Sequence, residues 1–460
     1  MTDAAAEASV RTSPPAPPNP LIDGPILPTL IGLATPNVVA LSIQSLVVIA
    51  ETSYIGRLGT EALAAMALVF PLIMLTQMMS SGAMGGGVSS AIARALGAGD
   101  PARARVLAAH AIAIGGGLGI VLSAVFMLTG PRLFAALGGR GTVLEMAIGY
   151  ATTFFAGALS IWLLNTLVSV VRGTGNMRLS SAVMIAIGGL QMLLGGALAL
   201  GFGPLPRLGL PGVAIGQITA FSAGVAFLAW YLTRPTARLR LTFSGVKPDR
   251  AMFRDILKVG AVACLSPLQS ILVVIIMARF AASFGTEDLA GFGLGIRLEL
   301  LLVPIAFAIG VACVPMVGMA IGAGRIDRAR RVAWTGACLA GGLIGGIGLI
   351  FAIAPTLWGR LFTAQAGVLA SLATYLGIAG FAFPAYGFGL CLYFASQGSG
   401  KILGPVLGGT VRLLVVIGGG LLLIGPGAPF SSLAVIVAAG MVAYGASTAL
   451  FVWLTRWGRN

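Results

Sequence analysis

The chain has 460 residues, of which 58% are hydrophobic and only 9% are charged. No soluble domain has this composition, so the sequence predicts an integral membrane protein with room for about a dozen spans of about 20 residues. The formal net charge of +15 would favour a nucleic-acid partner in a soluble protein. Here the basic residues gather in particular loops, which is typical of membrane topology, and we expect no nucleic-acid partner.

Residues 1–27 are polar and rich in proline, without the charged and apolar regions of a cleavable signal, and are expected to form a cytoplasmic tail. After them, apolar runs bounded by charged residues, glycine and proline predict an all-α integral membrane fold of twelve transmembrane helices. The predicted spans are residues 28–54, 62–95, 104–129, 143–171, 178–201, 211–233, 254–284, 288–323, 329–353, 366–396, 402–425 and 431–455.

Lysine and arginine residues are distributed unevenly between the two sides of the membrane in this arrangement. With a cytoplasmic amino terminus, 20 of them lie in cytoplasmic segments and 6 lie in the opposite loops. This excess predicts a multi-pass protein of the inner (cytoplasmic) cell membrane with both termini in the cytoplasm. The basic segment 234–253 is then a cytoplasmic linker.

Four short segments recur 225 or 226 residues further along the chain, in a consistent register. The pairs are Gly59–Ala64 with Gly285–Ala290, Leu96–Gly99 with Ile321–Gly324, Arg172–Gly175 with Gln397–Gly400, and Gln44–Val48 with Gln269–Val273. Six helices separate equivalent points, and because six is even, both copies enter the membrane in the same direction. We therefore expect two like-oriented six-helix bundles related by an internal repeat, an N-terminal lobe at 28–233 and a C-terminal lobe at 254–460.

The first predicted span carries one acidic residue, Glu51, and no basic residue that could neutralise it. An ionised side chain in a bilayer core costs between about 2.5 and 17 kcal/mol, so such residues normally face a cavity and have a function there. Glu51 is therefore the leading candidate for a functional site. The alternative is that Glu51 lies at the membrane surface near Arg57, as part of a solvated helix end.

Several motifs follow Glu51 in a particular order. They are Ile55–Ala64, Phe70-Pro71, the turn Leu96–Asp100 and the segment Arg172–Asn176. Taken together, these motifs resemble the multidrug and toxic compound extrusion (MATE) family, and the resemblance extends from the first span to the last. It implies a twelve-helix, two-lobed antiporter that expels organic, often cationic compounds in exchange for protons or sodium.

Glu51 falls where this family usually carries an aspartate in the first helix, a residue tied to cation coupling in the N-terminal lobe. The fifth span departs from the family pattern, because Gln191 and Gly195 stand where many members have an asparagine and an aspartate. The missing second acid argues against a sodium site of the usual composition.

We therefore expect Glu51 to couple export to protons, with a sodium-coupled exporter of the same family as the alternative. Burial of a carboxyl group favours its neutral form, so a single carboxyl group suits proton exchange, whereas sodium prefers several oxygen ligands at once. Neutral and ionised Glu51 would favour different packings of the helices, and a cationic substrate would compete with the proton for the same cleft. No cofactor other than this coupling ion is expected.

Polar residues and one methionine within the spans are candidates for a substrate cavity. They are Gln44, Gln191, Gln217, Met78 and Gln269. Gln44 lies two helical turns before Glu51 on the same face, so it is expected to share its cavity. Interhelical hydrogen bonds and core packing are the alternative roles of these residues.

The eighth span holds two charged residues, Arg297 and Glu299. Intramembrane charges usually pair with one another, so one interpretation is a structural ion pair, with Arg279 as a further possible partner of Glu299. The other is a second cation or substrate site in the C-terminal lobe. The two interpretations are compatible.

Other classes of protein fit the sequence less well. An enzyme is not expected, because the only histidine, His110, has no nucleophile or metal-ligand cluster near it, and the four cysteines lack metal-site spacing. A flippase of related fold for lipid-linked precursors is the competing hypothesis, but its cleft would need several basic residues, and the spans offer chiefly Arg297 and Arg412. The expected partners are small organic substrates and membrane lipids, with the protein acting as a monomer.

Overall fold

The fold comes from a computed structural model that describes residues 19–202, 205–242 and 247–458. Most of the predicted tail, residues 1–18, lies outside the described residues. In the described part, eleven helices are long and apolar enough to cross a membrane, and a twelfth span consists of two helices that meet at an angle of 47°. The prediction of an all-α protein with twelve spans is confirmed.

The helices follow the predicted spans in order. The first half contains α1 (Pro20–Asp23), α2 (Ile26–Gly56), α3 (Thr60–Gln77), the π-helical turn η1 (Met78–Met84), α4 (Gly85–Gly97), α5 (Pro101–Ala136), α6 (Gly141–Ala156), α7 (Ala158–Gly173), α8 (Met177–Leu200) and α9 (Leu210–Thr233). The second half contains α10 (Arg250–Ala263), α11 (Leu265–Ala281), α12 (Thr286–Gly322), α13 (Ile326–Ile353), α14 (Thr356–Gly359), α15 (Ala366–Ala379), the short turn η2 (Gly380–Ala382), α16 (Phe383–Ser399), α17 (Leu403–Leu423) and α18 (Ser431–Leu454).

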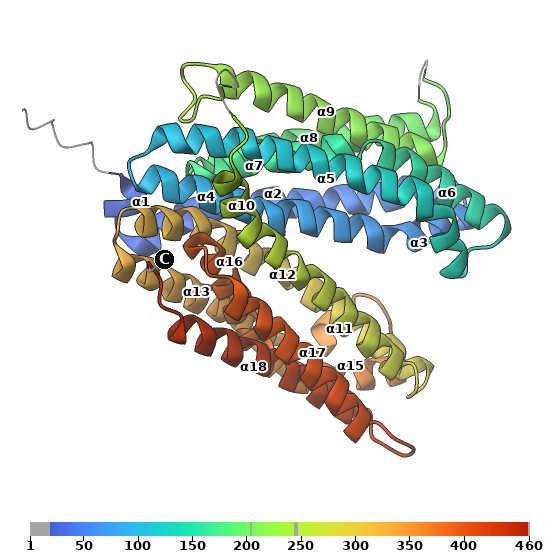
Figure 1. Cartoon of the computed structure of the whole chain (residues 1–460). Coiled ribbons are helices and arrows are strands. Elements are labelled where there is room, and N and C mark those ends of the chain that lie inside the picture. The colour runs from blue at the N-terminus through green and yellow to red at the C-terminus, as the bar shows by residue number, and fades with distance from the viewer. Residues whose placement is uncertain (1–18, 203–204, 243–246, 459–460) are drawn as a thin grey trace, which may run out of the picture.

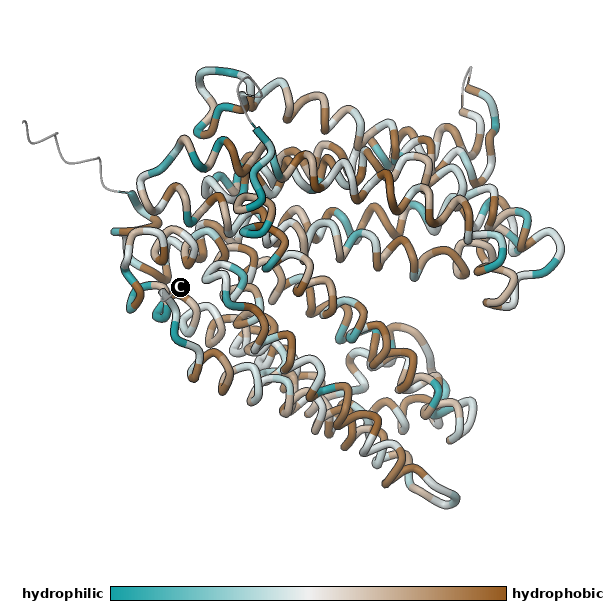
Figure 2. The backbone as a smooth tube through the Cα atoms, in the orientation of Figure 1, coloured by the Kyte–Doolittle hydropathy of each residue, from teal (hydrophilic) through white to brown (hydrophobic). Residues whose placement is uncertain are grey.

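The helices form two lobes, each with its own hydrophobic core. One core gathers buried residues of α3 to α9 with the end of α2, and the other gathers buried residues of α11 to α18 together with Leu21, Leu30, Ala34 and Ala93 of the first half. The lobes approach each other at the end of the molecule that holds α1 and the C terminus, and they diverge towards the opposite end (Figure 1). Hydrophobic residues run along the helices, while hydrophilic residues collect near helix ends and at the start of α10 (Figure 2).

The segment between the lobes differs in detail from the predicted linker at 234–253. The side chain of Asp249 accepts a hydrogen bond from the backbone N–H of Ala251 at 2.8 Å, so α10 begins at Arg250, before the predicted start of the seventh span. The backbone N–H of Asp249 in turn donates to the Nε2 atom of His110 on α5 at 2.9 Å. His110 therefore ties the start of the second half to the first.

Helix α10 packs against the N-terminal lobe, although the sequence predicts residues from 254 onwards to belong to the C-terminal lobe. A Cβ atom on Gly87 of α4 would lie 2.8 Å from the backbone nitrogen of Gly260 on α10, so only glycine allows this approach. The hydrophobic core of the N-terminal lobe also contains the buried side chain of Ile256. The lobes thus interlock at α10.

A pair of repeat-related glycines brings the two lobes together. A Cβ atom on Gly97 of α4 would overlap the backbone of Met319 on α12, and one on Gly322 of α12 would overlap the backbone of Arg94 on α4. Gly97 and Gly322 are 225 residues apart in the sequence, as are Arg94 and Met319, so each contact is the counterpart of the other in the internal repeat. The backbones of α4 and α12 can cross this closely because neither glycine has a side chain.

Ion pairs surround this crossing. Arg94 binds Asp255 of α10 at 2.8 Å, and Arg103 of α5 binds the other carboxylate oxygen of Asp255 at 3.2 Å. Arg94 also donates to the backbone carbonyl oxygen of Gly398 on α16 at 3.4 Å. We call the region of Arg94, Arg103, Asp255 and Gly398 the closed end.

Asp255→Asn is expected to loosen α10, through which the C-terminal half is anchored to α4 and α5, and so to let the lobes separate more often at the closed end. Removing one partner of a buried ion pair costs about 3–5 kcal/mol, and the partial water exposure of these side chains places the expected cost below that range. Spin labels on Ala102 and Asp327, which are exposed on α5 and α13, report the distance between the lobes by electron paramagnetic resonance. A broader distribution with longer distances is expected, and an unchanged distribution contradicts the role given to Asp255. Glu61→Gln, at an exposed residue of α3, is the control.

Candidate functional site

Glu51 lies in the membrane-spanning part of α2 and is only 8% exposed. Its Oε1 atom accepts a hydrogen bond from Nε2 of Gln191 on α8, at 2.6 Å. Among the described residues, Glu51 forms no ion pair with a basic side chain. Arg57, the basic neighbour in the alternative of a solvated helix end, is exposed, whereas Glu51 is buried.

Tyr54 lies so close to α8 that position 195 has no room for a side chain, which explains the glycine there. A Cβ atom on Gly195 would lie 2.9 Å from the phenol oxygen of Tyr54, and one on Gly196 would lie 3.4 Å from its ring. The side chain of Tyr54 thus fills the volume that a second carboxylate would need. Within the described part of the chain, the buried phenol oxygen of Tyr54 and the buried Oε1 atom of Gln191 have no hydrogen-bond partner, so two polar atoms beside Glu51 are free to bind.

Two further predicted cavity residues lie in the same lobe. The amide oxygen of Gln44 lies 3.4 Å from the position of a Cβ atom on Gly188, so Gln44 faces α8, as Glu51 does. Gln217 is buried on α9. Glu51, Gln191 and Gln44 are therefore brought to the α2–α8 contact, which we call the N-terminal site.

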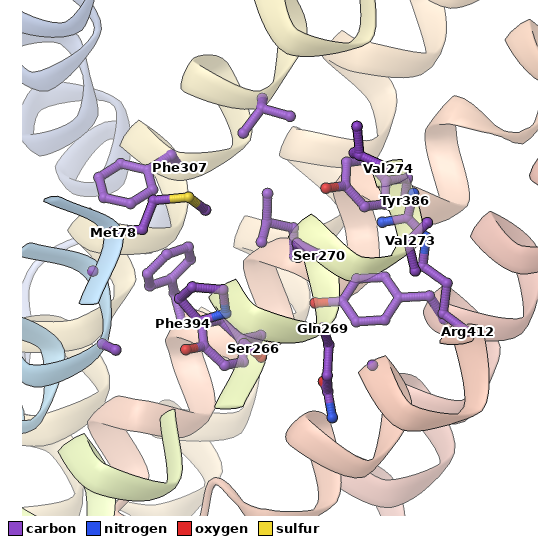
Figure 3. Close-up of a pocket in the computed structure, with 18 of the residues that line it drawn as sticks. Met78, Ser266, Gln269, Ser270, Val273, Val274, Phe307, Tyr386, Phe394 and Arg412 are labelled. Atoms are coloured by element: carbon purple, nitrogen blue, oxygen red, sulfur yellow. The ribbon is translucent and has the colours of Figure 1, made fainter. Parts of the chain in front are cut away.

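A separate pocket opens on the C-terminal lobe, with a cavity volume of about 160 Å³. Three residues predicted to line a substrate cavity contribute to it, namely Met78, Gln269 and Glu299. Figure 3 shows Met78, Phe307 and Phe394 towards one side of this pocket and Tyr386 and Arg412 towards the other. Because Met78 belongs to η1 and most of the lining belongs to α11, α12 and α16 to α18, this C-terminal pocket touches both lobes.

Glu299 is paired with an arginine, as the sequence predicts, but with a different one. Its Oε1 atom lies 3.4 Å from Nη2 of Arg412 on α17. The expected partners Arg297 and Arg279 are exposed, and the guanidinium carbon of Arg297 lies 6.0 Å from the ring centre of Phe362. The prediction that Arg297 lines the cavity is wrong, because Arg297 points away from Glu299 and is not part of the pocket lining.

Sequence reasoning did not place Arg412 in a site. Arg412 could have been found from the sequence, because it is a single charged residue within the apolar run 402–425, just as Glu51 is in the first span. The guanidinium carbon of Arg412 lies 4.6 Å from the ring centre of Tyr386, so the charge is held between a carboxylate and an aromatic face. In the described residues, no three acidic, histidine or cysteine side chains gather as metal ligands.

The sequence profile of the MatE family matches the chain twice, at residues 36–195 and 263–422, which is one match for each repeat. The chain is similar to a probable multidrug resistance protein, NorM, of Deinococcus radiodurans, with 30% identity over 77% of this chain and 78% of the relative. It is also similar to an FAD transporter of Shewanella oneidensis, with 27% identity over 68% of this chain and 69% of the relative.

Solved structures show the same fold. A multidrug resistance MATE family transporter of the MOP superfamily, in an outward-facing conformation, aligns with a TM-score of 0.82 over 92% of this chain and 94% of that one, at 24% identity. A MOP superfamily transporter from Pyrococcus furiosus, whose binding pocket is described as having reverse polarity, aligns with a TM-score of 0.85 over 94% and 96% of the two chains, at 23% identity. With the family profile matching both repeats and the NorM relative matching most of its length, the chain belongs to the MatE family of multi-pass membrane transporters, which includes multidrug efflux proteins.

Proposed function

We propose that this protein is a proton-coupled antiporter that exports organic, cationic or amphipathic compounds, with Glu51 as the coupling residue. The observation that carries the proposal is the burial of Glu51 with one amide partner and no ion pair among the described residues. An ionised carboxylate without a counter-ion is costly in this environment, and protonation removes the cost. The residue is therefore suited to bind and release one proton during transport.

The surroundings of Glu51 favour protons over sodium as the coupling ion. The amide of Gln191 presents an N–H group, and not its oxygen, to the carboxylate, and an N–H group is not a cation ligand. The position where many relatives have a second acid is Gly195, and Tyr54 occupies its space. A site with one carboxylate and a phenol matches the requirements of a proton better than those of a hard cation.

In the proposed cycle, ionised Glu51 attracts a cationic solute and protonated Glu51 does not. Proton and solute then exclude each other from the N-terminal site, so one must leave before the other binds. The hydrogen bond from α8 gives each protonation state a different strength of contact between α2 and α8, because a charged acceptor binds an N–H group more strongly than a neutral one. Protonation of Glu51 therefore weakens the contact between α2 and α8, and ionisation strengthens it, so the two states favour different packings of the lobe.

We further propose that the closed end faces the cytoplasm of a protein in the inner membrane, with both termini inside. The connection from α9 to α10, which carries the basic segment, lies at the same end as α1 and the C terminus (Figure 1). The divergence of the lobes towards the opposite end then corresponds to an outward-facing arrangement. This orientation suits a state that releases its solute and accepts a proton.

Transport by the purified protein in liposomes tests the coupling ion. An inwardly directed proton gradient at constant sodium is expected to drive counter-movement of a cationic dye such as ethidium. A sodium gradient at equal pH on both sides is expected to give no more movement than protein-free liposomes. Transport that follows the sodium gradient and ignores the pH gradient rejects the choice of proton.

A further inference from the structure

The C-terminal pocket has an apolar body and one cationic end. Its lining is mainly aliphatic and aromatic, and it includes the rings of Phe307, Phe394, Tyr386 and Tyr444. Among the described residues of the lining, Arg412 is the one basic residue, and it is only 8% exposed. In Figure 3 the side chain of Arg412 lies beside Tyr386 and Val273, at the opposite side of the pocket from Phe307. Such a shape suits a flat, apolar solute with one polar end.

Arg412 has more hydrogen-bond donors than the surrounding residues use. A guanidinium group has five N–H donors and no acceptor. The structure gives Arg412 one carboxylate contact, from Nη2 to Glu299 at the long distance of 3.4 Å, and its buried Nε atom has no hydrogen-bond partner among the described residues. A carboxylate that used both Nε and Nη2 of the guanidinium fork would form a better pair than Glu299 does.

We propose that the C-terminal pocket binds the carboxylate of an aromatic organic acid, which takes the place of Glu299 on Arg412. The acid group accepts from Nε and Nη2 of Arg412, and the ring lies in the apolar body between the two lobes. This is a second binding site, separate from the N-terminal site at Glu51. The exporter would then accept acidic amphipathic compounds in addition to cationic ones.

A chemical asymmetry within the pair favours an anionic ligand over a cationic one. A cation bound to Glu299 would displace Arg412, and a guanidinium group cannot lose its charge in a protein, so an unpaired buried cation would remain. An anion bound to Arg412 displaces Glu299, and this carboxyl group can become neutral by taking up a proton. Only the anionic ligand leaves no uncompensated charge in the pocket.

Binding of an organic acid is therefore linked to the uptake of one proton at Glu299. The titratable groups that face Glu299 or Arg412 from the surrounding helices are Tyr375 on α15, Tyr386 on α16 and Tyr444 on α18. The three phenols and the guanidinium group do not change charge between about pH 6 and pH 8, because free tyrosine titrates near 10 and arginine above 12. Glu299 is left as the group that supplies the pH dependence.

Equilibrium binding of three probes with the same ring tests the proposal. The probes are 2-naphthoate, its methyl ester, and 2-naphthylmethylamine, which carry a negative, a neutral and a positive charge. Their binding to the purified full-length protein in lipid nanodiscs is followed by fluorescence anisotropy, without any ion gradient, so failure of the coupling proposal does not affect the readout. For the wild type we expect naphthoate to bind about tenfold more tightly than the ester or the amine, and more weakly as the pH rises.

Substitutions at the pair separate recognition from packing. Glu299→Gln is expected to bind naphthoate about tenfold more tightly and without dependence on pH, because the competing carboxylate is gone. Arg412→Gln combined with Glu299→Gln leaves a neutral pair that avoids a lone buried charge, and this variant is expected to bind naphthoate and its ester equally. Glu61→Gln makes the same change of charge as Glu299→Gln at an exposed position outside the pocket and serves as the matched control.

Three outcomes overturn the proposal. Tighter binding of the amine than of naphthoate, lost in Glu299→Gln, assigns the pocket to cations. Equal affinity for all three probes in the wild type shows that Arg412 recognises no charge. A loss of naphthoate affinity in Glu299→Gln, at an unchanged thermal unfolding temperature, shows that the two carboxylates do not compete for Arg412.

Discussion

Glu51→Gln is expected to reduce proton-driven export in liposomes to the level of protein-free controls while leaving the fold intact. The substitution replaces the carboxyl group by an amide of the same shape that can neither bind nor release a proton. The new amide can still accept the hydrogen bond that Gln191 donates, so the contact between α2 and α8 is kept. Loss of transport at an unchanged thermal unfolding temperature therefore reports the missing proton.

Two comparison variants sharpen this experiment. Glu51→Asp keeps a titrating group but moves it away from Gln191 by the length of one methylene, so partial export is expected. Glu145→Gln removes an exposed acid from α6 of the same lobe and is expected to export like the wild type. Export by Glu51→Gln that still follows a pH gradient rejects Glu51 as the coupling residue, whichever compound is transported.

Valine in place of either glycine at the crossing of α4 and α12 is expected to force the closed end apart. In Gly97→Val the new side chain meets the backbone of Met319, and in Gly322→Val it meets the backbone of Arg94. Backbone atoms cannot move aside as a flexible side chain can, so the expected cost lies at or above the upper end of the roughly 1–3 kcal/mol typical of overpacking. The lobes should then occupy a separated arrangement more often.

The distance between spin labels on Ala102 and Asp327 and the thermal unfolding temperature together measure this effect. A longer distance and a lower unfolding temperature are expected for both variants, to similar extents, because the two contacts are counterparts in the repeat. Gly117→Val and Gly342→Val are the controls, since a Cβ atom at either position meets no other atom within 4 Å. They make the same change of side chain in a helix without the clash. An equal response of controls and test variants contradicts the crossing as the cause.

The twelve spans and the internal repeat could be predicted from the sequence because both are encoded locally. A helix in a bilayer must satisfy its backbone polar groups internally and present apolar side chains over about 20 residues, so composition alone marks it. The repeat is visible because short segments of the two halves have similar sequences, and the two matches of the family profile confirm it. Glu51 stood out for the same local reason, as an acid without a partner in an apolar run.

Contacts between distant helices could not be derived in this way. The sequence suggested Arg297 as the partner of Glu299 because the two are close in the chain, but residues two positions apart project from different sides of a helix. The actual partner, Arg412, is 113 residues away, and its side chain on α17 reaches Glu299 on α12 only in the folded protein. The proposed acid site rests on the unused Nε donor of Arg412. The sequence around Arg412 does not show that this donor is unused.

Tertiary structure likewise decided which lobe each element serves and which volumes are filled. Helix α10 is C-terminal in sequence, yet it packs on the N-terminal lobe because Gly87 and Gly260 allow the two backbones to touch. The sequence determined that position 195 lacks an acid, whereas only the structure showed that Tyr54 fills its place beside Glu51. Apolar length and charge determine where helices cross a membrane, but side-chain volume at the contacts between them decides which polar groups meet.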